Sequence, residues 1–369
     1  MKIKFNNFQE EVKEYQEEFI AAVEAVLFSG WYILGREVLA FEKEFANYLG
    51  AKHCIGVGNG LEALQISLMA LGIREGDEVI TTPISAVATT LAILAVKARP
   101  VFVDTTEDGL IDTNKISQAL TKHTKVILPV HLYGNSVELS KILALCKRHK
   151  LYLIEDACQA HGSQYRSRKL GTFGDLGCFS FYPTKNLGGL GDGGAIVTNK
   201  NKLASLCYQI RDYGQKGKYK HVRYGLNSRL DEIQAAILKV KLKNLDKNND
   251  KREQLALRYM HNLSKFPQIK VIKPPGDSKG NFHLFVIQTR ERDQLKLYLE
   301  KSDIPVAVHY PLLIPQQLFL KGFYNCQNLP NAKKFVKRIL SLPCHPQMTI
   351  QQVDYICGKI NSFYYNEVG

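Results

Sequence analysis

The stretch Phe179-Ser-Phe-Tyr-Pro-Thr-Lys185-Asn-Leu-Gly-Gly-Leu-Gly-Asp-Gly-Gly194 holds one lysine between an aromatic, proline-bounded segment and a glycine-rich run. A lysine whose amine is desolvated has a lowered pKa and can form a Schiff base with a carbonyl group. The glycines let the backbone pass close to a bulky ligand, because they carry no Cβ atom. Lys185 is therefore a candidate catalytic residue, although in a chain with 49 lysines and arginines a solvated surface lysine is the ordinary alternative.

Strands and helices alternate around this stretch, which predicts an α/β domain with a mainly parallel mixed sheet flanked by helices. The expected strands are 53–57, 78–82, 99–104, 125–132, 151–156 and 195–198, and the expected helices are 9–28, 36–49, 61–71, 86–97, 114–121, 137–149, 203–213 and 228–245.

After residue 247 the alternation is less regular. Strands are expected at 282–288 and 306–310, and helices at 292–301 and 331–340. We therefore predict a large domain, residues 1–247, with an N-terminal helical segment, and a smaller C-terminal α+β domain, residues 248–369.

The composition indicates a folded cytoplasmic protein. No apolar run is long enough to cross a membrane, the N-terminus has no export signal, and the eight cysteines are scattered without metal-ligand spacing. The net charge of +14 points to an anionic partner, and the basic, aromatic run 216–224 is the best argument for nucleic acid. Because no nucleic-acid-binding motif accompanies it, we favour a substrate that carries phosphate and expect no nucleic-acid, membrane or metal partner.

Two further features fit a phosphorylated cofactor. Gly58-Asn59-Gly60 joins a strand to a helix that starts at Leu61, and free N–H groups at such a helix start bind anions, although a plain turn is the alternative. Asp156 ends a strand, where an acid can also simply cap a helix. Together with Ser180 and Lys185 they match the needs of pyridoxal phosphate, which are a phosphate site, an acid for the ring nitrogen and an amine for the aldehyde.

A set of motifs along the chain carries a family resemblance. They are Gly56-Val-Gly-Asn-Gly-Leu-Glu-Ala-Leu64, Gly76-Asp-Glu-Val-Ile80, Val130-His-Leu-Tyr-Gly134, Glu155-Asp-Ala-Cys-Gln-Ala-His-Gly162, Phe179 to Lys185, Gly191-Asp-Gly-Gly194, Gly225 to Ala236 and His309-Tyr-Pro311. Through these motifs the chain resembles the DegT-type nucleotide-sugar aminotransferases of fold type I, which depend on pyridoxal phosphate. The resemblance covers nearly the whole chain and looks closest to enzymes that aminate carbon 3 of dTDP-3-keto-6-deoxyhexoses.

The resemblance implies a role for each matched residue. Lys185 would bind the cofactor aldehyde and move the proton. Asp156 would pair with the ring nitrogen, and Gln159 would lie near the ring hydroxyl. The expected phosphate ligands are Gly60, Leu61, Ser180 and, from the neighbouring subunit of a homodimer, Asn227; the expected substrate ligands are Lys218, Tyr219, Arg229, His309 and Tyr310.

The sequence departs from many relatives at Leu61, where they have threonine, and at Ala86, where they have an aromatic residue. By resemblance, L-glutamate gives its amino group through pyridoxamine phosphate to the keto sugar and leaves as 2-oxoglutarate, and lipopolysaccharide O-antigen is an expected destination of the product. The alternatives are amination at carbon 4, a sugar dehydratase, which Lys185 argues against, and a cofactor-binding regulator.

Overall fold

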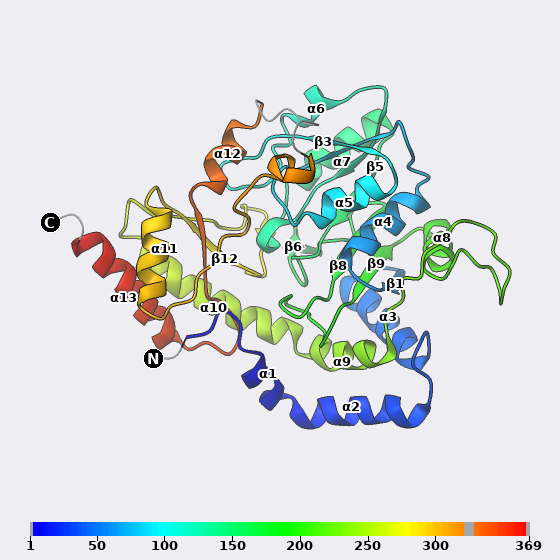
Figure 1. The fold of residues 1–369 in the computed structure, drawn as a ribbon, viewed down its shortest axis with the longest axis horizontal. Helices are drawn as coiled ribbons and strands as arrows, with labels where there is room; N and C mark the ends of the chain where they lie inside the picture. The colour runs from blue at the N-terminus through cyan, green and yellow to red at the C-terminus, as the bar shows by residue number, and fades with distance from the viewer. Residues whose placement is uncertain (1–2, 321–327, 367–369) are drawn as a thin grey trace.

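The computed structural model describes residues 3–320 and 328–366, and its centre is a seven-stranded sheet (Figure 1). The strand order is β1-β9-β8-β5-β4-β2-β3. Strands β3, β2, β4, β5 and β8 run parallel, and β9 and β1 complete one edge in antiparallel pairs. This is the mainly parallel mixed sheet that the sequence predicts. The strands are β1 (His53–Val57), β2 (Glu78–Thr81), β3 (Arg99–Phe102), β4 (Thr124–Leu128), β5 (Tyr152–Asp156), β8 (Leu176–Ser180) and β9 (Gly194–Thr198).

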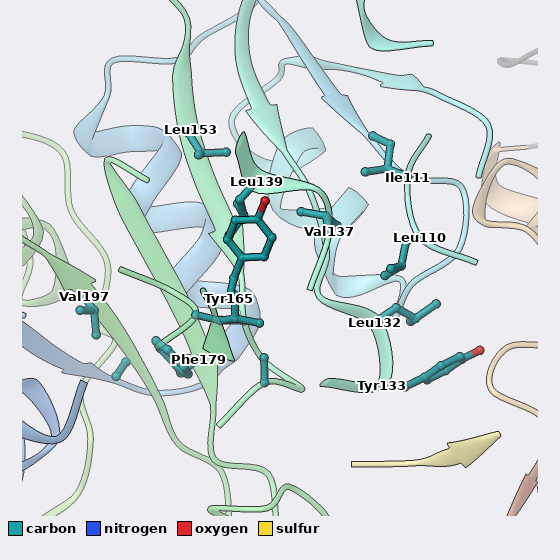
Figure 2. Packing of buried hydrophobic residues seen from close by; sticks show 14 of the residues in the cluster. Leu110, Ile111, Leu132, Tyr133, Val137, Leu139, Leu153, Tyr165, Phe179 and Val197 are labelled. Carbon is teal, nitrogen blue, oxygen red and sulfur yellow. The ribbon is translucent and has the colours of Figure 1, made fainter. Parts of the chain in front are cut away.

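Successive side chains of a strand point to opposite faces of the sheet. Both faces of this sheet are apolar, and helices cover both of them. In β4, Val126 and Leu128 pack into one apolar cluster and Ile127 into another. Figure 2 shows part of the second cluster, in which Leu153 and Phe179 of the sheet lie among residues of the neighbouring loops. The first face carries α4 (Gly60–Ala70), α5 (Ala88–Ala95) and α8 (Asn201–Arg211), and the second carries α3 (Arg36–Leu49), α7 (Leu139–His149) and α9 (Glu232–Lys243).

The C-terminal part is built on a separate antiparallel sheet of three strands, in the order β10-β12-β13. Its helices enclose a separate hydrophobic core, which belongs to the C-terminal part and includes Leu295, Val353 and Phe363. The boundary predicted after residue 247 lies in the first turn of α10, and the division into two domains stays a prediction. These elements are α10 (Leu245–Leu263), β10 (Lys270–Val271), β12 (Phe285–Gln288), α11 (Arg292–Lys301), α12 (Pro330–Val336), β13 (Ile339–Leu342) and α13 (Ile350–Asn366).

Several local predictions are wrong. The strand expected over 125–132 ends at Leu128, and strand β8 was not predicted. The helix expected over 331–340 ends at Val336, because the next residues pair with β12 as strand β13. The strand expected over 306–310 forms only an isolated bridge between Ala307 and Ser341. The N-terminal helix is divided at Tyr15, whose side chain is buried, into α1 (Phe8–Glu14) and α2 (Gln16–Ser29).

Short elements complete the fold and tie its two parts together. A small sheet in the order β11-β6-β7 pairs residues from the C-terminal part with a loop that follows Asp156. The remaining elements are α6 (Ile116–Ala119), η1 (Leu132–Gly134), β6 (Gln164–Tyr165), β7 (Arg168–Lys169), β11 (Ser278–Lys279), η2 (Ile314–Gln316) and η3 (Leu318–Leu320).

Three observations concern cysteines, metal ligands and membrane-spanning helices within residues 3–320 and 328–366. The seven cysteines in these ranges are free thiols, and Cys326 lies outside them. No His, Cys, Asp and Glu side chains of the described residues group as metal ligands would. Within the same ranges, no helix is both long enough and apolar enough to cross a membrane.

A carboxylate that is distant in sequence caps helix α3. Glu232, buried at the start of α9, accepts hydrogen bonds from the backbone N–H groups of Gly35 (2.8 Å) and Val38 (2.9 Å) through Oε1 and of Glu37 (2.8 Å) through Oε2. The first N–H groups of a helix have no partner within the helix. Glu232 therefore satisfies three of them, and its own N–H donates to Tyr32 O (3.1 Å), so it also fixes the loop before α3.

Replacing Glu232 with alanine should lower the free energy of unfolding by about 2–3 kcal/mol, because it leaves backbone donors of α3 without an acceptor. The measurement is the midpoint of urea denaturation. Glu232→Gln keeps one carbonyl oxygen and should lose less. Equal losses in the two variants would show that the hydrogen bonds to α3 do not explain the effect.

Candidate active site

Lys185 lies on the turn that follows β8, at the carboxyl edge of the parallel strands. Two backbone hydrogen bonds close this turn, from Lys185 N to Tyr182 O and from Gly189 N to Phe181 O, both 2.8 Å. The Lys185 side chain is half-buried and lines a cavity of about 300 Å³. Burial lowers the pKa of its amine, and the nearby Cys158 and Asp156 oppose that shift. A lowered pKa increases the fraction of free amine, which is the form that attacks a carbonyl.

Asp156 ends β5 at the same edge of the sheet, and its buried carboxylate is held from two sides. Oδ2 accepts a hydrogen bond from Thr89 Oγ1 (2.8 Å), and Oδ1 accepts one from Cys158 N (3.2 Å). Ser85 Oγ lies 2.8 Å from Thr89 Oγ1 and continues the chain of hydroxyl groups. The carboxylate therefore has a fixed position, as an acid that faces one ring nitrogen requires.

Gly60 forms a tight cradle with Ser180 at the start of α4. A Cβ atom on Gly60 would lie 2.7 Å from Ser180 Cβ and 3.0 Å from Cys158 Sγ, so only glycine fits there. Asn59 caps the helix by accepting a hydrogen bond from Glu62 N (2.9 Å). Leu61 is half-buried in the first turn. Free backbone N–H groups and the Ser180 hydroxyl thus meet where a phosphate group could bind.

His309 and Tyr310 reach the cavity from the C-terminal part and line it with Lys185. His309 Nδ1 lies 2.9 Å from Ser341 Oγ, and burial lowers the pKa of His309 to about 4. Gln159 accepts a hydrogen bond from Tyr133 N (2.6 Å) and donates one to the Tyr310 hydroxyl (3.2 Å). Burial raises the pKa of Tyr310 to about 12, so this hydroxyl stays protonated at neutral pH.

Part of the cavity wall was not predicted from the sequence. Phe5 and Asn6 line the cavity from the N-terminal segment, and the Phe5 ring lies 5.9 Å from the His309 ring. Tyr182 and His283 also line it. No local motif marks Phe5, whereas Tyr182 stands three residues before Lys185 and could have been proposed from that position.

Four predicted ligands lie away from this cavity in the single chain. Lys218 and Tyr219 are exposed on the loop after α8, where the Lys218 amine lies 5.3 Å from the centre of the Tyr219 ring. Arg229 pairs with Asp212 (3.3 Å). Asn227 is exposed, and its side chain has no hydrogen-bond partner in the described part of the chain. Their roles as ligands stay predictions.

The residues at this edge fit pyridoxal phosphate. The fit rests on an amine with a lowered pKa at Lys185, a fixed carboxylate at Asp156 and a cradle at Gly60 that a Cβ atom would fill. These three features supply the aldehyde partner, the acid for the ring nitrogen and the phosphate site. Gln159 and Ser180 lie beside them and remain candidate ligands.

His161 makes the stability of this region dependent on pH. Its buried ring lies 5.5 Å from Phe179 and 5.9 Å from Phe181. Burial first, and then the charge of Lys185, lowers the pKa of His161 to about 3, while the Ser180 backbone opposes the shift. The unfolded chain therefore binds a proton near pH 6.5 that the folded chain does not bind, so stability falls as the pH drops from about 6.5 toward 3.

His161→Phe should remove this contribution, which is about 1.4 kcal/mol for each pH unit below 6.5. Chemical denaturation at pH 8 and at pH 5.5 measures it. We expect the parent to lose more stability than the variant between the two pH values. The same loss in both proteins would contradict a neutral, buried His161.

The chain is similar to sugar aminotransferases over nearly its full length. The sequence profile of the DegT/DnrJ/EryC1/StrS aminotransferase family matches residues 13–361. A dTDP-3-amino-3,4,6-trideoxy-alpha-D-glucose transaminase of Streptomyces venezuelae is 40% identical over 94% of this chain and 92% of its own. A dTDP-3-amino-3,6-dideoxy-alpha-D-galactopyranose transaminase of Aneurinibacillus thermoaerophilus is 41% identical over 95% and 96%. The crystal structure of S. venezuelae DesV with a ketimine intermediate superposes with a TM-score of 0.96 at 39% identity and covers 98% of both chains.

Proposed function

The chain belongs to the DegT/DnrJ/EryC1/StrS aminotransferase family, which depends on pyridoxal phosphate, and from this premise we propose that it transfers an amino group to a nucleotide-linked keto sugar. The proposed donor is L-glutamate, and the proposed acceptor is carbon 3 of a dTDP-3-keto-6-deoxyhexose. The observation that carries this proposal is the similarity, at 40% and 41% identity, to two transaminases named for dTDP-3-amino sugars.

The residues of the site divide the chemistry between them. Pyridoxal phosphate supplies an aldehyde and an electron-withdrawing ring when it is bound. Asp156 would hold the proton on the ring nitrogen. Lys185 Nζ would remove the α-proton of glutamate and, in the second half-reaction, deliver a proton to carbon 3 of the sugar, because a partly desolvated amine can act as base and then as acid.

We propose a homodimer in which each subunit completes the site of its partner. Large apolar side chains at the end of α2 and on the loop after it are exposed, with Phe28 at 89% and Trp31 at 64%. Figure 1 shows α2 on the outside of the molecule, next to α9. Apolar side chains gathered at one exposed place favour a protein contact. The exposed loop with Lys218 and Tyr219 fits a role in the partner's phosphate and diphosphate sites, as does Asn227, whose side chain has no partner within residues 3–320 and 328–366.

Dimers that contain two different variant chains test whether each subunit completes the site of its partner. Lys185→Ala and Asn227→Ala chains, unfolded together and refolded, should regain activity that neither variant has alone, because one site of the mixed dimer contains both wild-type residues. Failure to regain activity, with dimers present, would place Asn227 in the site of its own chain.

Separate half-reactions test the function itself. The protein loaded with pyridoxal phosphate should lose its yellow colour with L-glutamate and release 2-oxoglutarate, and a dTDP-keto sugar should then restore the colour. The position of the new amine, determined by NMR of the product, separates carbon 3 from carbon 4. A protein that stays yellow with glutamate would contradict the proposal and favour a cofactor-binding regulator. Cytoplasmic location and use of the product in O-antigen stay predictions.

A further inference from the structure

We propose that His283 is a specificity-determining residue, which accepts a hydrogen bond from a sugar hydroxyl group through Nε2. This inference rests on the proposed aminotransferase function. His283 precedes β12, is buried, and lines the same cavity as Lys185 and His309. The chemistry of its ring is set by the side-chain amides behind it.

Two backbone carbonyl groups fix the orientation of those amides. Asn249 Nδ2 donates to His161 O (2.9 Å), so Asn249 Oδ1 faces Asn186. Asn186 Nδ2 donates to this oxygen (2.8 Å) and to Asn281 O (2.9 Å). A carbonyl oxygen can only accept, so turning either amide over would place two oxygens together. Asn186 therefore presents Oδ1, an acceptor, to His283.

The position of the His283 proton follows from this contact. Asn186 Oδ1 lies 3.2 Å from His283 Nδ1, so Nδ1 must carry a hydrogen to donate. Burial first, and then the charge of Lys185, lowers the pKa of His283 well below its ordinary value, so the ring is neutral and has a single N–H. Nε2 consequently has a lone pair and no hydrogen, and it has no hydrogen-bond partner among residues 3–320 and 328–366.

The side chain of Asn281 holds the main chain that carries this ring. His283 N donates to Asn281 Oδ1 (3.0 Å), and Asn281 Nδ2 donates to Gln159 O (3.0 Å) and His161 O (3.1 Å). His283 is thus tied to the loop that follows Asp156. A fixed acceptor is more selective than a mobile one, because it cannot turn to meet a different group.

A bare imidazole nitrogen selects donors. The keto oxygen and phosphate oxygens of the sugar nucleotide only accept hydrogen bonds, as do the carboxylates of glutamate, and the glutamate amine is the group that reacts. The deoxyribose hydroxyl and thymine N3–H of the nucleotide also donate, but they lie beyond the diphosphate, at the other end of the molecule from the keto carbon. A sugar hydroxyl next to the reacting carbonyl is therefore the donor that can reach His283, which lines the cavity with Lys185. In contrast, His309 Nδ1 faces the Ser341 hydroxyl, which can donate or accept, so its tautomer is not set in this way. The inference therefore concerns His283 alone.

Two substitutions at this position separate the roles of its two nitrogens. His283→Asn places an amide N–H near the position of Nδ1, so it keeps the contact with Asn186 and removes the acceptor in the cavity. His283→Gln reaches the position of Nε2 and can present an oxygen there. The probes are the dTDP-linked amino sugar with a hydroxyl beside the amino carbon and its deoxy counterpart, whose affinities are measured by calorimetry.

We expect the parent to bind the hydroxylated sugar about 10-fold more tightly than the deoxy sugar, because a site built for a hydroxyl leaves a polar atom unpaired without it. His283→Asn should reduce the ratio of the two affinities, hydroxylated to deoxy sugar, to about one. His283→Gln should retain part of the preference for the hydroxylated sugar. In rapid-mixing experiments, His283→Asn should also slow the sugar half-reaction at least about 10-fold more than the glutamate half-reaction.

A parent without preference for the hydroxyl, or a His283→Asn protein with the full preference, would overturn the inference while the aminotransferase function stands. If His283→Asn does not fold, the test rests on His283→Gln. Its mobile amide should give a smaller affinity ratio of hydroxylated to deoxy sugar than the parent has, and an unchanged ratio would overturn the inference. Absence of the glutamate half-reaction in the parent would instead contradict the proposed function, and this inference with it.

Discussion

Lys185→Ala protein, loaded with pyridoxal phosphate, should transfer amino groups at least about 10³-fold more slowly than the parent. Proton transfer by a positioned side chain contributes about 10²–10⁴-fold, and the same amine binds the cofactor aldehyde. The histidines that line the cavity with Lys185 are weak bases and poor replacements for it, since burial lowers the pKa of the half-buried His309 to about 4 and the pKa of the buried His283 well below its ordinary value. Rates of the glutamate half-reaction measure the loss, and the visible spectrum reports the bound cofactor.

The matched control is Lys43→Ala, on the exposed side of α3, which should keep the rate and spectrum of the parent. Added small primary amines should restore part of the rate to Lys185→Ala, because they can enter the 300 Å³ cavity and carry the missing proton. A Lys185→Ala protein within about tenfold of the parent rate would remove Lys185 from the proton transfer.

Local patterns predicted only part of the centre of the site. Asp156 and Ser180 each end a parallel strand, and the carboxyl ends of neighbouring parallel strands meet at one edge of a sheet. Gly60 follows β1 at the adjoining position, where its missing Cβ makes room for Ser180. The alternation predicted the strand that ends at Asp156, but neither β8 nor the strand order was predicted. The position of Ser180 beside Asp156 therefore comes from the structure.

The cavity wall could not be predicted in the same way. Phe5 and His283 reach Lys185 only through the packing of the N-terminal segment and the second sheet, and neither carries a local signal. The cap that Glu232 gives α3 joins residues 197 positions apart. Likewise, residues 339–342 continue an apolar helical pattern in sequence but pair with β12, because tertiary pairing outweighs local propensity in a short segment.

Asp156→Asn should slow both half-reactions by about 10²–10³-fold while the protein stays folded. The neutral amide cannot hold the ring nitrogen protonated, and breaking a buried charge pair costs about 3–5 kcal/mol. The fold should tolerate the change, because asparagine Oδ1 can still accept from Cys158 N. Its Nδ2 would face Thr89 Oγ1, which can accept that bond and donate to Ser85 Oγ instead.

Thr89→Val serves as the matched control for Asp156→Asn, because it removes one hydrogen bond to the carboxylate and leaves its charge in place. A hydrogen bond to a charged group is worth about 1.5–3 kcal/mol, so the valine variant should lose clearly less rate than the asparagine variant. Stopped-flow rates with glutamate measure both, and urea midpoints check that folding is retained. A larger loss from Thr89→Val would mean that the position of the carboxylate, more than its charge, limits the reaction, since the charge is lost only in the asparagine variant.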